Sequence, residues 1–191
     1  MDEEENDDRV GLYGSKKALT KGQWDEIVRG LGLVSIEFQQ LESVIKMAIG
    51  ELVGSTEVII GALITAELSF KAASHLLYAL ATYRWPNDSA ALQRLNDALN
   101  RCEQIEGERN RLIHSDWYPD TKTGKGAIRY KSTARNRKGL RIQREPTTPA
   151  DMNKVAEELK SCRHELWDLL IDKLPNLKNE FTRLMAIPKA S

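Results

Sequence analysis

A long run of apolar residues at helical spacing constrains the fold more than any other feature of this sequence. Between Gln23 and about Leu52, apolar residues recur at gaps of three and four, as Ile27, Leu31, Val34, Phe38, Leu41, Ile45, Ala48 and Leu52. This spacing follows the period of an α-helix and places these side chains on one face. Because other helices must cover such a face, the run predicts a mainly helical fold.

Three further segments carry the same periodicity. One spans residues 56–85 and is stopped by Pro86, since proline cannot continue a helix. The next opens at the Asn-Asp-Ser sequence of residues 87–89, which are good N-cap residues, and we expect an interruption near Gly107. The last opens at the Thr-Pro-Ala-Asp sequence of residues 148–151, which combines an N-cap, a proline at the first helical position and an acid.

Residues 119–145 have a different pattern, with glycines that bound the runs AIRYKST and LRIQR. Apolar and basic residues alternate with period two in both runs, as they do in strands. We therefore predict a β-hairpin at about residues 125–145. The expected fold is a bundle of four to five helices with this hairpin inserted before the last long helix.

The length of 191 residues suits one buried core, which we assign to residues 21–176. Residues 1–20 form an acidic tail that we expect to be disordered, and residues 177–191 form a C-terminal tail. The first ten residues include six acids and no apolar leader, and no apolar stretch is long enough to cross a bilayer. These features predict a cytoplasmic protein without a membrane partner.

Neither a metal nor a cofactor is expected. Cys102 and Cys162 fall at apolar helical positions, which predicts reduced core residues rather than a disulfide framework. Cys162 and His164 are two residues apart on a helix and point in opposite directions, so they cannot chelate one metal. His75 lies in an apolar helix and is expected to be a core or interface histidine.

The hairpin region is strongly basic, with nine basic and two acidic residues between positions 120 and 145. A solvated charged hairpin and a surface that contacts phosphates are about equally compatible with this density. For the second interpretation we select six candidate RNA-binding residues: Arg129, Lys131, Arg135, Arg137, Lys138 and Arg141.

A compact polar motif lies at the end of the third helical segment. Arg109 is followed by Asn110, then by apolar residues and by His114. On a helix Asn110 and His114 would share one face, and the long Arg109 side chain could reach round to them.

This motif resembles that of the HEPN superfamily, in which an arginine and a polar residue precede a histidine by a similar spacing. The layout of residues 23–175 is also similar to that of a HEPN helical bundle. The resemblance implies a homodimer with facing motifs, and it implies RNA cleavage without a metal, as many members perform. A bacterial defence, toxin or stress role is implied by the family alone, with an antitoxin or a regulatory protein as a further partner.

The residue types suit that chemistry. Attack by the RNA 2′-hydroxyl needs proton transfer and positive charge beside the phosphate. His114 suits the acid or base role, Arg109 suits charge stabilisation and Asn110 would orient. One histidine per chain does not easily serve as both acid and base, and a dimer would supply two.

The sequence departs from one branch of the family at a single position, and two alternatives to an RNA-cleaving enzyme remain. In the toxin branch paired with a minimal nucleotidyltransferase antitoxin, a modified tyrosine commonly sits two residues after the histidine, whereas this chain has Asp116 there and Tyr118 two residues later.

The first alternative is a non-catalytic HEPN module that binds RNA, a nucleotide or a protein. The second is a structural helical dimer in which the motif serves folding.

Overall fold

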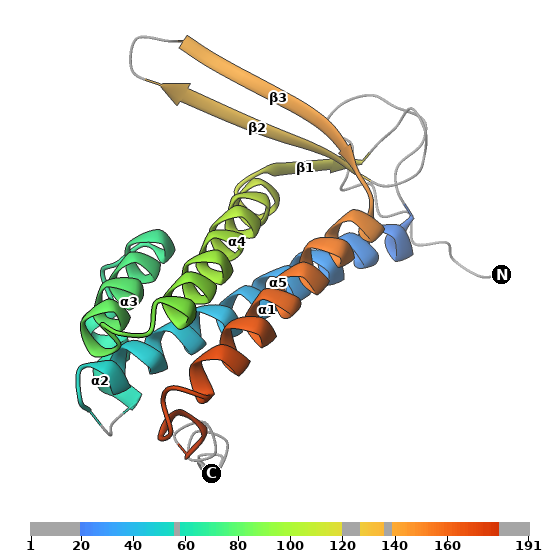
Figure 1. The fold of residues 1–191 in the computed structure, drawn as a ribbon. Helices are drawn as coiled ribbons and strands as arrows, with labels where there is room; N and C mark the ends of the chain where they lie inside the picture. Colours follow the sequence, from blue (N-terminus) through green and yellow to red (C-terminus); the bar gives the residue numbers. More distant parts are fainter. Residues whose placement is uncertain (1–19, 56–57, 120–126, 136–138, 180–191) are drawn as a thin grey trace, which may run out of the picture. The chain divides into compact units, whose positions relative to one another are not determined.

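The computed structural model describes residues 20–55, 58–119, 127–135 and 139–179. The fold is mainly helical, as predicted, with a small antiparallel sheet (Figure 1). The elements follow in the order α1 (Lys21–Leu52), α2 (Val58–Thr65), α3 (Phe70–Arg84), α4 (Ser89–Ile113), β1 (Asp116–Pro119), β2 (Ala127–Arg135), β3 (Gly139–Thr147) and α5 (Pro149–Ile171).

The chain groups into two compact units. The sheet unit comprises the residues up to Leu33 together with Arg111–Lys154, and the helical unit comprises Val34–Asn110 and the residues from Val155 onward. Helices α1, α4 and α5 contribute residues to both units.

In the helical unit, contacts join the helices into a bundle. Phe38 of α1 packs against Phe70 of α3, with ring centroids 5.1 Å apart. Glu37 of α1 forms an ion pair with Arg163 of α5 at 3.1 Å. Helices α4 and α5 are joined by the ion pair between Arg101 and Glu165.

The apolar face predicted for the first helix is the buried face of α1. Seven of its eight residues are buried, and Leu31 is half-buried. Leu177 is also fully buried, one residue beyond the C-terminal boundary that we predicted at residue 176.

The continuous helix predicted over residues 56–85 is wrong, because α2 ends at Thr65 and α3 begins at Phe70. Ser69 has extended backbone angles, and its side chain accepts a hydrogen bond from the Ala72 backbone nitrogen as the N-cap of α3. The buried Thr65 hydroxyl donates to the Gly61 carbonyl oxygen at 2.8 Å. Both side chains bond to the backbone locally, which is how serine and threonine compete with helix continuation.

The interruption expected near Gly107 is also wrong, because α4 continues from Ser89 to Ile113. A single glycine costs about 1 kcal/mol of helix propensity, which the packing of the same helix offsets. That packing includes Leu95, Leu99, Cys102 and Ile105, which are all buried.

In the sheet unit, β2 and β3 form the predicted antiparallel hairpin, with Arg129 opposite Glu145 in the register. The sequence did not predict β1, which pairs antiparallel with β2 and makes a sheet of three strands in the order β1-β2-β3. Tyr118 of β1 and Tyr130 of β2 meet edge to face, with ring centroids 5.3 Å apart. Such aromatic pairs stabilise neighbouring strands, which explains how so short a strand joins the sheet.

The helix start predicted at Thr148 is confirmed. The Thr148 backbone nitrogen donates to an Asp151 carboxylate oxygen at 2.8 Å, and the Asp151 backbone nitrogen donates to the Thr148 hydroxyl at 3.3 Å. This reciprocal capping box satisfies two donors at the start of α5. Because the Thr148 hydroxyl and the Thr148 backbone nitrogen both donate hydrogen bonds to the Asp151 carboxylate, the pKa of Asp151 lies below its usual value.

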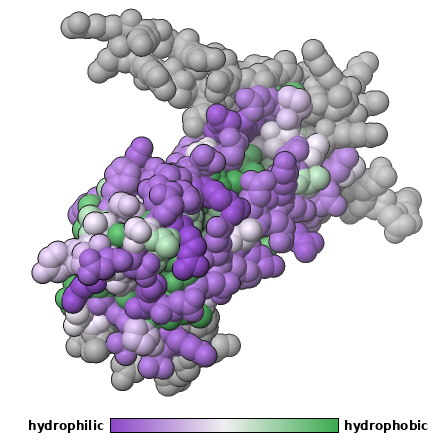
Figure 2. All heavy atoms as spheres, viewed as in Figure 1, coloured by the Kyte–Doolittle hydropathy of each residue, from purple (hydrophilic) through white to green (hydrophobic). Residues whose placement is uncertain are grey.

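Apolar side chains remain exposed on several elements, and Figure 2 shows apolar surface over α2 and α3. On α2, Ile59 is 60% exposed and Leu63 is 64% exposed, and these two residues lie one helical turn apart. Among the described residues no single helix is long and apolar enough to span a membrane. The bent pair Ile59–Thr65 and Phe70–Arg84 meets that test together, by length and composition only.

Candidate functional site

Arg109 lies on α4 in the helical unit and is half-buried. The central carbon of its guanidinium sits 4.3 Å from the centroid of the Phe38 ring on α1. Phe38 is only 3% exposed. The contact is a cation–π interaction, which is attractive and gains strength where water is excluded.

Asn110 links Arg109 to a third residue of α4. The Arg109 Nη1 donates to the Asn110 Oδ1 at 2.7 Å, and the Asn110 Nδ2 donates to the Glu106 Oε1 at 3.1 Å. The Arg109 Nε is buried and has no hydrogen-bond partner among the described residues. A buried donor without a partner opposes folding, so Arg109 is costly as a purely structural residue.

His114 follows directly after the last residue of α4, and its side chain is exposed. It belongs to the sheet unit, whereas Arg109 and Asn110 belong to the helical unit. The carbonyls at the end of α4 are satisfied by side chains of the same unit. The Trp117 indole nitrogen donates to the Leu112 carbonyl at 3.1 Å, and the Ser115 hydroxyl donates to the Arg111 carbonyl.

Arg129, one of the predicted RNA-binding residues, is buried within the sheet unit. Arg129 on β2 is 7% exposed and forms an ion pair with Glu145 on β3. Its Nε is buried without a partner among the described residues. Arg129 therefore joins the two strands from inside the sheet unit and presents little surface for RNA.

The structure places the other five predicted RNA-binding residues only in part. Lys131 and Arg135 are positions of β2, and Arg141 is a position of β3. Arg137 and Lys138 lie outside the described residues. The hairpin thus carries three of these positions on two paired strands.

The two cysteines are buried and free, as predicted. A hydrogen bond with Cys162, together with burial, holds the pKa of Cys102 above its usual value. Both residues lie in the helical unit, one on α4 and one on α5. Within the described part of the chain, no group of three or more His, Cys, Asp or Glu side chains could hold a metal ion.

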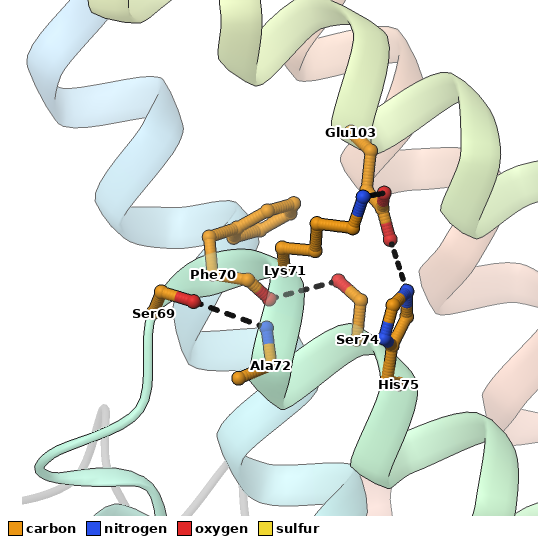
Figure 3. Close-up of polar contacts among 7 residues, drawn as sticks. All are labelled: Ser69, Phe70, Lys71, Ala72, Ser74, His75 and Glu103. Atoms are coloured by element: carbon orange, nitrogen blue, oxygen red, sulfur yellow. Dashed lines mark hydrogen bonds and ion pairs between the residues drawn. The ribbon is translucent and has the colours of Figure 1, made fainter. Parts of the chain in front are cut away.

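A second polar cluster joins α3 and α4 (Figure 3). Glu103 of α4 contacts Lys71 at 3.7 Å and the His75 Nε2 at 3.4 Å, both on α3. The His75 side chain is 66% exposed, so His75 is not a core histidine. Surface pairs of this kind stabilise weakly, and we assign the cluster to the packing of α3 on α4.

Sequence reasoning missed two residues that touch the motif, Phe38 and Glu106. Phe38 was assigned to the core face of the first helix, and nothing in the sequence shows that an arginine on another helix covers its ring. Glu106 precedes Asn110 by four residues on α4, a spacing that brings side chains together on a helix. That spacing was a signal that could have identified Glu106.

Comparisons of this chain with models of known protein families, with curated proteins and with solved structures found no match. The resemblance to the HEPN superfamily therefore rests on the sequence motif and the helical layout.

Proposed function

We propose that this protein is a HEPN-like, metal-independent endoribonuclease that cleaves RNA through attack of the 2′-hydroxyl on the adjacent phosphate. His114 transfers a proton as general acid or base, Arg109 stabilises the charge on the phosphate and Asn110 orients Arg109. The observation that carries the proposal is the motif itself: an arginine whose side chain is hydrogen bonded to Asn110, followed five residues later by an exposed histidine.

The environment of each residue supports its role. The His114 side chain is exposed, so its imidazole is open to a substrate. Imidazole gains and loses protons near neutral pH, as acid–base catalysis requires. Arg109 is held by the Asn110 amide and the Phe38 ring rather than by a carboxylate that would neutralise its charge.

The proposal includes partners and a setting. Two protomers would bring two histidines to one cleft, so that one acts as acid while the other acts as base. The exposed apolar residues of α2 provide surface for such a homodimer. RNA is the substrate, the setting is a bacterial defence, toxin or stress system in the cytoplasm, and an antitoxin or regulatory protein is a further partner.

An RNA-cleavage assay on the purified protein tests the proposal. His114→Ala should abolish cleavage of single-stranded RNA without changing the helical content. His164→Ala, which removes an exposed histidine from α5, should cleave like wild type. Products should end in a 2′,3′-cyclic phosphate, and a chelator should not slow the reaction. Wild-type protein that leaves a panel of RNAs intact, or a His114→Ala protein that still cleaves, contradicts the proposal.

The role of Arg109 is tested with a variant that keeps the positive charge. Arg109→Lys retains the positive charge and loses the planar fork that contacts Asn110 and Phe38. Since one well-placed donor to a transition-state charge is worth about 3 kcal/mol, cleavage should fall by roughly a hundredfold. A Lys variant with the wild-type rate would mean that charge alone suffices.

The basic hairpin gives a separate test of RNA binding. Replacing Arg135, Arg137 and Lys138 with alanine should flatten the dependence of affinity on salt, because fewer counterions leave the phosphates. If the dependence of affinity on salt does not change, the hairpin is only a solvated loop and does not contact the RNA phosphates.

The second candidate is a non-catalytic module that binds RNA, a nucleotide or a protein. The contact of Arg109 with Phe38 favours it, because this contact gives the arginine a packing role between α4 and α1. Wild-type protein that binds RNA but never cleaves it would select this candidate.

A further inference from the structure

We infer that Phe38 and Glu106 are positioning residues for Arg109, which fix the direction of its guanidinium from two sides. The inference rests on the proposed function, since it assigns these residues to the site that would hold the scissile phosphate. It adds a residue of α1 and an acidic residue of α4 to a motif defined by Arg109, Asn110 and His114.

Phe38 limits where the guanidinium can lie. Arginine has a long side chain with many rotamers, and a contact of 4.3 Å with a ring centroid selects those that lay the cation over that ring. The ring is itself held in place by burial, because Phe38 is only 3% exposed. A buried ring is a rigid support for the charge.

Glu106 sets the orientation of the Asn110 amide. An asparagine amide has a donor end and an acceptor end, whereas an ionised carboxylate only accepts hydrogen bonds. The Glu106 Oε1 accepts from the Asn110 Nδ2 at 3.1 Å, and this bond turns the Asn110 Oδ1 toward the Arg109 Nη1 at 2.7 Å. With the amide reversed, donor would face donor and Arg109 would lose its partner.

Phe38 acts through Arg109, and Glu106 acts through Asn110. Glu106 accepts a hydrogen bond from Asn110, and Phe38 contributes a ring face to Arg109. If Glu106 positions Asn110, its acceptor oxygen matters and its negative charge does not. If Glu106 transferred a proton itself, the charge and titration would be essential. This difference makes the inference testable by conservative substitution.

Glu106→Gln keeps an oxygen that accepts from Asn110, and Glu106→Ala removes it. We expect Glu106→Gln to cleave RNA at nearly the wild-type rate and Glu106→Ala to lose roughly ten- to hundredfold in kcat with little change in KM. Glu103→Ala is the matched control on the same helix, because Glu103 pairs with Lys71 and His75 instead. A Glu106→Gln protein as impaired as Glu106→Ala overturns the inference for Glu106.

Phe38→Leu retains apolar volume and removes the ring face. The matched control is Phe70→Leu, which removes the partner ring of Phe38 and leaves Arg109 on Phe38. We expect the two variants to lose similar stability, whereas only Phe38→Leu should lose roughly tenfold or more in kcat. Equal kcat in the two variants would reduce Phe38 to a packing residue.

A readout independent of cleavage separates this inference from the proposed function. In nitrogen-15 NMR, the Arg109 side-chain NH signal should carry a ring-current shift that is lost in Phe38→Leu and kept in Phe70→Leu. The same signal should change in Glu106→Ala and stay in place in Glu106→Gln. If wild type cleaves no RNA, the proposed function fails while these signals still decide the positioning. A signal that is identical in all variants overturns it.

Discussion

Adding one methyl group at Gly61 should destabilise the protein, although glycine is a poor helix former. Gly61 lies inside α2, and a Cβ placed there would come within 2.8 Å of the Lys46 carbonyl carbon and 3.1 Å of the Gly50 nitrogen. It would come closer still to the Lys46 oxygen. All three atoms belong to the backbone of α1, which cannot turn aside as a flexible side chain would.

The magnitude follows from two opposing terms. Replacing glycine by alanine inside a helix favours folding by about 1 kcal/mol. Overpacking typically costs about 1–3 kcal/mol, and a clash with backbone belongs at or above the upper end. We therefore expect Gly61→Ala to lower the free energy of unfolding by about 2 kcal/mol.

Gly107→Ala is the matched control, because a Cβ at Gly107 would meet nothing within 4 Å in the interior of α4. Gly107→Ala should gain helix propensity without a steric clash, and it should therefore raise the free energy of unfolding by about 1 kcal/mol. Urea denaturation followed by helical circular dichroism measures both variants, and their midpoints should move in opposite directions from wild type. A Gly61→Ala protein as stable as wild type or more stable would refute the close packing of α2 on α1.

Three further predictions concern acidity, thiols and assembly. Asp151→Asn should cost about 1 kcal/mol at neutral pH, because it weakens the capping box of α5. Since the pKa of Asp151 is lowered in the folded state, that cost should persist above about pH 4 and vanish as the pH falls through the folded pKa; a pH-independent difference contradicts this. Cys102 and Cys162 should resist alkylation by iodoacetamide in native protein and react in urea, whereas fast native labelling would contradict their burial. Light scattering at micromolar concentration should give the mass of a homodimer, and a strictly monomeric mass would remove the paired-site mechanism.

The helical periodicity predicted the longest elements because burial follows it closely. The apolar face of α1 and the capping box at Thr148 could both be found in the sequence, since each depends on residues close together in the chain. The break between α2 and α3 could not be found by periodicity, because the apolar stripe continues on both sides of it. There Ser69 decides the outcome through its own N-cap bond.

The candidate site was predictable only where its contacts are local. Arg109 and Asn110 are adjacent in the sequence, and a hydrogen bond joins their side chains. The support from Phe38 depends on how α1 packs against α4, which no local pattern encodes. Arg129 looked like one of several similar basic residues, yet the register that places it opposite Glu145 buries it.

Trp117, whose indole donates a hydrogen bond to the last turn of α4, can serve as a fluorescence reporter. Trp117 is half-buried, its nitrogen donates to the Leu112 carbonyl, and it lies three residues after His114. Indole emission shifts to longer wavelength when water replaces such a partner. A variant that keeps Trp117 and replaces the other three tryptophans with phenylalanine would therefore report, by its emission colour, when the chain beside His114 opens to water or closes over a bound molecule.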